Sequence, residues 1–183
     1  MTRILGIAGS LRKASFNAGL LRAAEGLMPA GASLEAHTLH GVPLYDADVE
    51  AANGVPPAVA VLKDALAACD GLLLISPEYN NGIPGVFKNA IDWMSRPPGG
   101  TGLFKAKPVA VIGASPGGFG TMLSQAAWLP VLRTLGTRHW SEGRLMVSRA
   151  GSLFDADGNL TDEETLKRLS EFLDGFARFA AAH

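Results

Sequence analysis

Ser10, Arg12, Ser15 and Asn17 bring two hydroxyl groups, a guanidinium and an amide together near the N-terminus. They closely follow an apolar run, residues 4–8. A guanidinium binds phosphate oxygens through two parallel N–H groups, and serine hydroxyls donate to the same oxygens without adding bulk. These residue types at this spacing therefore predict a phosphate-binding loop.

The elements on either side would hold this loop at the start of a helix. Residues 4–8 are apolar throughout, which is typical of a buried strand, and the spacing of Leu20, Leu21 and Ala24 predicts an amphipathic helix after the loop. The first N–H groups of a helix have no partner within it, and the helix dipole favours negative charge there. A plain strand-to-helix connection with Ser15 as N-cap is the alternative, and for Ser15 alone both interpretations stay open.

The kind of phosphate follows from what the loop lacks. Only Gly6 and Gly9 precede the helix, so the dinucleotide-binding pattern Gly-x-Gly-x-x-Gly is absent. The second expected strand, residues 33–39, ends without an acidic residue to hold a ribose hydroxyl, and the chain has no Gly-Lys-Ser/Thr. A loop rich in serine and asparagine suits a terminal monophosphate, such as that of flavin mononucleotide (FMN), better than a bridging pyrophosphate.

Two further loops rich in turn residues follow apolar runs later in the chain. Residues 77–84 come after the run 71–76, and residues 115–121 come after the run 108–114. Apolar runs that alternate with helix patterns predict an α/β fold, a parallel sheet with helices on both faces. Five strands fit the flavodoxin-like three-layer sandwich of order 2-1-3-4-5, whose ligand site lies at the carboxyl ends of strands one, three and four. The three loops are therefore expected to meet at one site.

Helix patterns fill the intervals between these strands. The later helices are predicted to start at Pro56 or Pro57, at Pro84 or Gly85, near Met122, and after the N-cap Thr161. Pro130 should kink or divide the third of these helices. The fifth strand is either 137–140 or 144–148, and residues 40–55 are expected to form a long loop.

Composition excludes several classes of function. The chain has 183 residues, 48% of them hydrophobic and 18% charged, with a formal net charge of −1. These values fit one globular domain over residues 1–183 and no nucleic-acid partner. No apolar run is long enough for a membrane span, so no membrane partner is expected. Cys and His residues do not cluster, and the turn at residues 155–159 lacks the later ligands of a calcium loop, so no metal site is expected.

The single cysteine and the N-terminal sequence predict where the protein resides. Cys69 cannot form an intrachain disulfide, and residues 1–3 lead into a short strand without the apolar region of a signal peptide. Together these features favour a cytoplasmic protein.

Residues 9–17, 77–80, 84–85 and 88–93 resemble motifs of the NAD(P)H-dependent FMN reductase family, and residues 43–48 match it too. Within the family, the sequence is most similar to bacterial quinone and chromate reductases. The resemblance implies a flavodoxin-like fold with bound FMN. The implied cofactor-binding residues are Ser10, Arg12, Ser15 and Asn17 for the phosphate, Pro77, Glu78, Tyr79 and Asn80 for the ribityl chain and one ring edge, and Ser115, Gly117 and Gly118 for the pyrimidine end of the ring.

Residue chemistry agrees with this assignment. Glycine in the third loop lets the backbone approach a ring, and Tyr79 and Asn80 can donate or accept hydrogen bonds beside it. Alternatives stay open for two positions: Tyr79 as a packed, half-buried aromatic, and Glu78 as a brace of its loop or a contact to a neighbouring subunit. Lys88 and Asp92 are expected to form a structural pair one helical turn apart, without a catalytic role.

The function implied by the resemblance is that of an FMN-dependent NAD(P)H oxidoreductase. It would reduce quinones or related small-molecule acceptors, such as azo compounds, free flavins or chromate, by two-step hydride transfer through FMN, with NADPH or NADH as co-substrate. No catalytic side chain is assigned, because the cofactor carries the chemistry. The alternatives are a flavodoxin-like FMN electron carrier without NAD(P)H oxidation of its own, and a phosphate-binding module without flavin. The net charge of −1 argues against a carrier, which often docks through a strongly acidic surface.

The resemblance also implies a homodimer or a homotetramer. Relatives carry an arginine and a tyrosine that join subunits, and this chain has Leu123 and Ala126 at the matching positions. The subunit contacts are therefore expected to differ from those of the relatives.

Overall fold

The computed structural model describes every residue of the chain, 1–183, in alternating strands and helices. The strands are β1 (Thr2–Ala8), β2 (Ala32–His37), β3 (Gly71–Ile75), β4 (Pro108–Ala114), β5 (Arg138–His139) and β6 (Met146–Val147). The α-helices are α1 (Phe16–Gly26), α2 (Ala47–Asn53), α3 (Pro57–Ala68), α4 (Gly85–Met94), α5 (Met122–Thr134) and α6 (Glu163–Ala181). Two short 3-10 helices cover Gly100–Leu103 and Ala150–Ser152.

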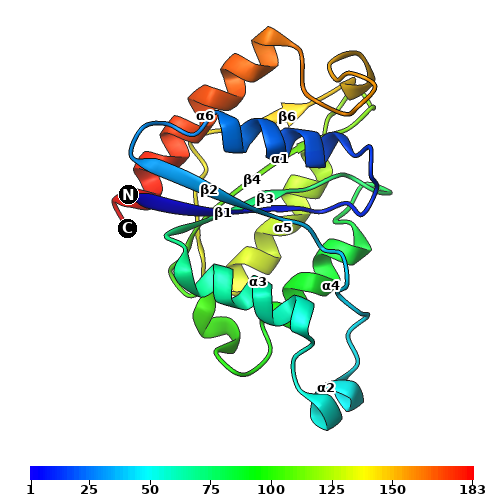
Figure 1. The fold of residues 1–183 in the computed structure, drawn as a ribbon, viewed down its shortest axis with the longest axis vertical. Coiled ribbons are helices and arrows are strands. Elements are labelled where there is room, and N and C mark those ends of the chain that lie inside the picture. The colour runs from blue at the N-terminus through cyan, green and yellow to red at the C-terminus, as the bar shows by residue number, and fades with distance from the viewer.

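All strand pairs of the sheet are parallel, in the order β2-β1-β3-β4-β5. This order confirms the flavodoxin-like topology predicted from the sequence. Helices α1 and α6 cover one face of the sheet, and α3, α4 and α5 cover the other (Figure 1). The carboxyl ends of β1, β3 and β4 therefore lie side by side at one edge, where the three predicted loops begin.

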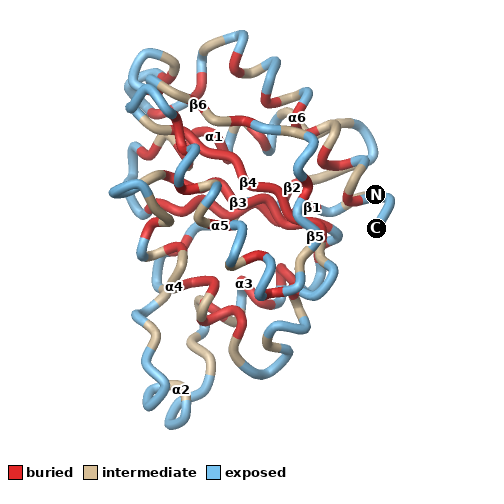
Figure 2. Tube along the Cα trace, turned by 180° about the vertical axis from the view of Figure 1, so that it is seen from behind, coloured by how far each residue is buried: buried red, intermediate tan, exposed pale blue.

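The central strands are buried on both faces, which explains their apolar runs. Consecutive side chains of a strand point to opposite faces. In β3, Leu73 and Ile75 join the core beneath α1 and α6, while Leu72 and Leu74 join the core on the side of α3, α4 and α5. Figure 2 shows these strands buried along their length between helices whose outer surfaces are exposed.

The edge of the sheet beyond β4 contains both segments that the sequence offered as the fifth strand. β5 pairs with the start of β4, and β6 pairs with its end, where Gly113 and Ala114 lie opposite Met146 and Val147. Strand β4 is seven residues long, so two short strands fit along it one after the other. As a result, β6 lies directly beside the loop that follows β4.

The segment 40–55, predicted to be a loop, contains the helix α2. Asp46 caps this helix, because its carboxylate accepts a hydrogen bond from the N–H of Asp48. No residue of α2 is buried, and the helix stands away from the rest of the molecule (Figures 1 and 2). A helix without a buried face has no hydrophobic periodicity, which is why the sequence pattern did not reveal it.

Two helix details also differ from the prediction. Asp162, not Thr161, caps α6, since its carboxylate accepts hydrogen bonds from the N–H and the hydroxyl of Thr165 at 2.9 and 2.6 Å. Pro130 does not divide α5, which remains one helix across it. The expected pair of Lys88 and Asp92 is confirmed, with Nζ 2.7 Å from the nearer carboxylate oxygen.

None of the helices is long and apolar enough to cross a lipid bilayer. The cytoplasmic location stays a prediction.

Candidate functional site

The three predicted loops meet at the carboxyl edge of the sheet around a cavity of about 40 Å³. Its lining includes most of the predicted site residues, namely Ser10, Arg12, Ser15, Asn17, Pro77, Glu78, Tyr79 and Ser115. The lining also contains three residues that the sequence analysis did not single out, Phe16, Ala114 and Pro116. The other predicted residues, Asn80, Gly117 and Gly118, lie outside it on exposed parts of the same loops.

Two serines of the first loop are almost completely buried, each with 4% of its surface exposed. The Oγ of Ser15 accepts hydrogen bonds from the N–H groups of Asn17 and Ala18 at 3.2 and 3.4 Å. Ser15 is therefore the N-cap of α1, as one of the two interpretations of this residue expected. The Oγ of Ser10 lies 3.4 Å from the hydroxyl of Tyr79. The first and second loops therefore touch across the cavity.

Backbone N–H groups of the first loop lack acceptors inside the protein. This holds for Ser10, Leu11, Lys13, Ala14, Ser15 and Phe16. They lie at the N-terminus of α1, where the helix dipole adds partial positive charge. Arg12 adds a guanidinium that forms no ion pair with a carboxylate and only a 3.4 Å hydrogen bond to the carbonyl of Ala14. The loop thus presents many donors and a positive charge, which suits a phosphate dianion.

Asn17 has a structural role that the sequence analysis missed. Its Nδ2 donates to the carbonyl of Ala114 at 2.8 Å, and its Oδ1 accepts from the N–H of Ala114 at 2.9 Å. These two hydrogen bonds join the first turn of α1 to the end of β4. One hydrogen of the Asn17 amide remains for a ligand, so its assignment to a phosphate stays a prediction.

The second loop is a tight hairpin. Tyr79 and Gly82 exchange two backbone hydrogen bonds of 3.3 and 3.0 Å, and the two residues between them, Asn80 and Asn81, have positive φ angles of 49° and 62°. Asparagine adopts this left-handed conformation more readily than most residues, which explains the Asn-Asn pair at the tip. Tyr79 is 47% exposed beside the cavity, which fits the half-buried aromatic that the sequence allowed and also leaves its ring free to contact a ligand.

Glu78 braces this hairpin from the other side. Its Oε2 accepts hydrogen bonds from the N–H groups of Leu123 and Ser124, at 2.8 and 2.9 Å, at the start of α5. Of the alternatives raised for Glu78, the brace within the chain is therefore the one that the structure shows.

The third loop leaves room around Gly117 and Gly118. Gly118 has no atom of the protein near the place where a side chain would begin, and Gly117 has only the hydroxyl of Ser115, at 3.4 Å. Neither glycine has a positive φ, so neither the backbone conformation nor packing requires glycine there. By contrast, a side chain at Gly9 would meet the ring of Phe87 at 2.1 Å. The exposed glycines are therefore the ones left free to approach a ligand.

A segment far along the sequence supports this third loop. The N–H of Ser115 donates to the carbonyl of Val147, and the N–H groups of Arg149 and Ala150 donate back to Gly117 and Ser115. The only sequence signal for this support was the strand predicted at 144–148. That prediction did not say which loop the strand would adjoin.

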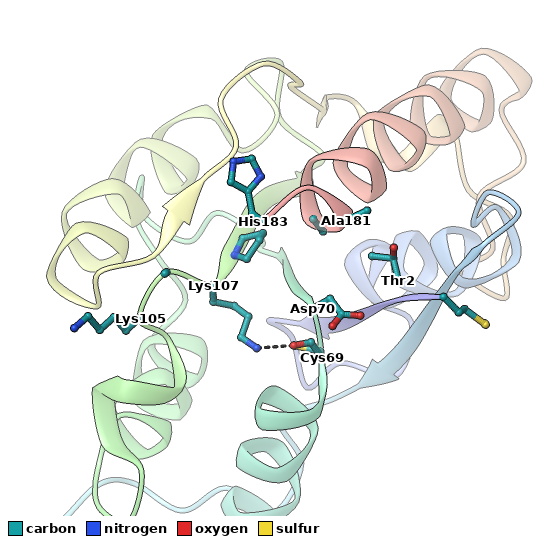
Figure 3. A pocket seen from close by; sticks show the side chains of 11 residues that line it. Thr2, Cys69, Asp70, Lys105, Lys107, Ala181 and His183 are labelled. Carbon is teal, nitrogen blue, oxygen red and sulfur yellow. Dashed lines mark hydrogen bonds between the residues drawn. The ribbon is translucent and has the colours of Figure 1, made fainter.

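A larger cavity, of about 500 Å³, lies at the opposite, amino edge of the sheet (Figure 3). Lys105, Lys107, Asp70 and His183 line it, and the ammonium of Lys107 donates a hydrogen bond to the carbonyl of Cys69. Burial raises the pKa of the Cys69 thiol. None of the three loops reaches this cavity, and its positive and negative groups are mixed, so it lacks the donor-rich character of the loop site.

Comparison with known proteins bears on what the loop site holds. A sequence model of the family described as NADPH-dependent FMN reductase matches residues 2–152. The NAD(P)H-dependent FMN reductase of Pseudomonas aeruginosa is 43% identical over 171 residues, which cover 93% of this chain and 91% of the relative. A 2-hydroxy-1,4-benzoquinone reductase of a Burkholderia species is 37% identical over 175 residues, covering 96% and 94%.

Solved structures agree with these relatives. The flavoenzyme NAD(P)H:(acceptor) oxidoreductase FerB of Paracoccus denitrificans superposes with a TM-score of 0.85 at 39% sequence identity. The superposition covers 100% of this chain and 99% of FerB. The similarity in fold therefore extends over the whole length of this chain.

Proposed function

The chain belongs to the NADPH-dependent FMN reductase family, and on this premise we propose that it is an FMN-dependent NAD(P)H oxidoreductase that reduces quinones and related small-molecule acceptors. Residues 1–183 act as a single FMN-binding domain in this proposal. Bound FMN supplies the redox chemistry, by taking a hydride from NAD(P)H and passing the electrons to the acceptor. The chain's own residues bind and orient the cofactor.

The observation that carries the proposal is the set of unpaired donors in the first loop. All but one of the backbone N–H groups from Ser10 to Phe16 have no acceptor in the protein; the exception, that of Arg12, donates to the hydroxyl of Ser10. The Arg12 guanidinium has no carboxylate partner. Ser10 and Ser15 are buried and Phe16 is half-buried, and donors in such places are costly without a partner unless a ligand completes them. The dianionic phosphate of FMN would accept hydrogen bonds from several of them at once.

The other two loops fit the remainder of the cofactor. The N–H of Gly118 has no acceptor in the protein, and no side chain occupies the space beside it. Such a group can donate to the pyrimidine end of an isoalloxazine ring and tune its electronics. Tyr79, half-exposed across the cavity, offers its hydroxyl and ring edge. An open site of this kind would leave one flavin face accessible to a nicotinamide and then to a quinone.

An absorption spectrum of the purified protein, recorded anaerobically before and after adding NADH or NADPH, tests the proposal. We expect flavin bands, present on purification or after reconstitution with FMN, that bleach to the two-electron reduced form and return when a benzoquinone is added. A protein that remains colourless after reconstitution would contradict the FMN site. Flavin bands that neither nicotinamide bleaches would indicate an electron carrier instead.

A homo-oligomer is the second part of the proposal. The outward face of α5 carries Met122, Leu123 and Leu129, each nearly half exposed, and Phe119 just before the helix is 78% exposed. Large apolar side chains gathered on one helix face are typical of an interface. Because the exposed side chains on this face are apolar, this interface would be apolar, in line with the resemblance, which implies that Leu123 and Ala126 stand where relatives carry an arginine and a tyrosine. We propose that a second copy of this chain packs on this face.

A further inference from the structure

Helix α5 begins without a cap of its own. Thr121 occupies the N-cap position, but its side chain makes no capping hydrogen bond and instead accepts one from Gln125 at 3.0 Å. The N–H groups that an N-cap normally satisfies, those of Leu123 and Ser124, both donate to the carboxylate of Glu78. A residue on the second loop therefore caps a helix 45 positions further along the chain.

A second set of contacts ties the same two segments together just beneath this carboxylate. The Oγ of Ser76 lies 3.0 Å from the Oγ of Ser124 and accepts a hydrogen bond from the indole N–H of Trp128 at 3.0 Å. All three residues are completely buried. The strand end that leads into the hairpin is thus fixed to α5 by neutral groups, and the hairpin beyond it is fixed by the charge of Glu78.

Few other groups hold the hairpin. Both Glu78 and Tyr79 line the cavity, but the carboxylate of Glu78 is bonded to α5, whereas the hydroxyl of Tyr79 meets Ser10. Asn80 and Asn81 are exposed and make no side-chain hydrogen bond. Without Glu78, the weak 3.4 Å contact of Tyr79 would be the remaining side-chain hydrogen bond between the hairpin tip and the body of the protein.

We propose that Glu78 is a positioning residue for the flavin, and that it acts by holding the hairpin 79–82 against α5 rather than by touching the cofactor. This inference rests on the proposed FMN site. The carboxylate of Glu78 lies at the positive end of the α5 dipole and accepts two N–H donors. These groups compensate its negative charge, although it lies beside a site proposed to bind a phosphate. A loop fixed before binding loses little conformational freedom when the ligand arrives, which preserves affinity.

Hydrogen exchange of the apoprotein tests the link without any flavin. We expect the Gly82 amide, which is hydrogen-bonded within the hairpin, and the amides of Leu123 and Ser124 to exchange faster in Glu78→Ala than in the wild type. Glu78→Gln should show intermediate exchange, because its amide oxygen still accepts both bonds without the charge. Unchanged exchange in Glu78→Ala would overturn the proposal whether or not the protein binds FMN.

Titrations with FMN and with riboflavin test the consequence for the cofactor. Glu78→Ala should weaken both ligands alike, by about tenfold, since a released loop must be ordered on binding and the phosphate contacts are untouched. Glu78→Gln should recover most of that loss. The positioning role would be overturned if Glu78→Ala bound FMN as tightly as the wild type does. It would also be overturned if the FMN affinity of Glu78→Gln were as low as that of Glu78→Ala.

Asp162→Ala is the matched control. Asp162 is also a carboxylate that caps a helix, but it caps α6 and does not line the loop cavity. Its removal should lower thermal stability and leave FMN affinity unchanged, whereas an equal loss of affinity in both variants would show general destabilisation and overturn the proposal. A wild-type chain that fails to bind FMN would refute the proposed function, while the exchange experiment would still decide the link between Glu78 and α5.

Discussion

The side-chain amide of Asn17 forms two hydrogen bonds with the backbone of Ala114, one as donor at 2.8 Å and one as acceptor at 2.9 Å. Asn17 is 3% exposed, so water does not compete for these bonds. The pair joins the start of α1 to the end of β4, which are the elements that carry the first and third loops. This asparagine therefore helps the sheet to set the relative position of the two loops.

Asn17→Ala should lower the free energy of unfolding of the apoprotein by about 2–4 kcal/mol, because it leaves two buried backbone groups of Ala114 without this partner. Urea denaturation without flavin measures the change. Asn159→Ala, which removes an exposed amide, is the control and should change stability little. Equal stability of Asn17→Ala and the wild type would show that the two bonds contribute nothing.

Arg12→Ala should weaken FMN binding by about 1.5–3 kcal/mol, the range for a hydrogen bond to a charged group. Riboflavin lacks the phosphate, so its affinity should not change. Quenching of flavin fluorescence on titration gives both dissociation constants. Lys13→Ala removes the neighbouring exposed charge and is the control that separates a specific contact from general electrostatic attraction. Undiminished FMN binding by Arg12→Ala would refute the assignment of Arg12 to the phosphate.

Gly118→Val should reduce FMN affinity and leave the melting temperature of the apoprotein unchanged. No protein atom lies within 4 Å of the place where its side chain would begin, so the valine would meet only the ligand. Gly102→Val is the control, since this glycine is equally unobstructed but lies in a 3-10 helix away from the three loops. If both variants bind FMN normally, the third loop does not approach the ring.

Leu129→Glu should convert the oligomer to a monomer, because a carboxylate on the apolar face of α5 would be buried without a partner. Light scattering coupled to size-exclusion chromatography measures the mass directly. Val61→Glu, at a similarly exposed apolar residue on α3, should leave the mass of the oligomer unchanged. A wild-type protein of monomeric mass would contradict the proposed interface.

Ionisation of the Cys69 thiol should lower the free energy of unfolding at alkaline pH. Burial raises the pKa of its thiol in the folded state, so the native protein holds this proton more tightly than the unfolded chain does. The contribution is complete below the unfolded pKa, about 8.5, and is lost as the pH rises through the folded pKa. Urea midpoints at neutral and alkaline pH should therefore differ more in the wild type than in Cys69→Ala, and an equal difference would contradict this assignment.

Much of the fold could be predicted because the necessary signals are local. The apolar runs of β1, β3 and β4 reflect burial on both faces, and the helix periodicities of α1, α3 and α6 reflect burial of one face. Each pattern lies within a single segment and repeats the geometry of that segment. Once the parallel order is inferred, the carboxyl ends of three strands must share one edge. The meeting of the three loops at one edge therefore follows from the order of the strands alone.

The sequence by itself therefore determined the topology, the position of the candidate site and the residue types that surround it. Only the tertiary structure decided what each side chain does there. Glu78 caps a helix 45 residues away, and Asn17 clamps a strand end 97 residues away. Such pairings depend on the final packing of elements that are distant in sequence. The residues next to a carboxylate or an amide in the sequence do not indicate which group will be its hydrogen-bond partner. The short helix α2 escaped prediction for a related reason, because it buries no face and so leaves no periodic pattern.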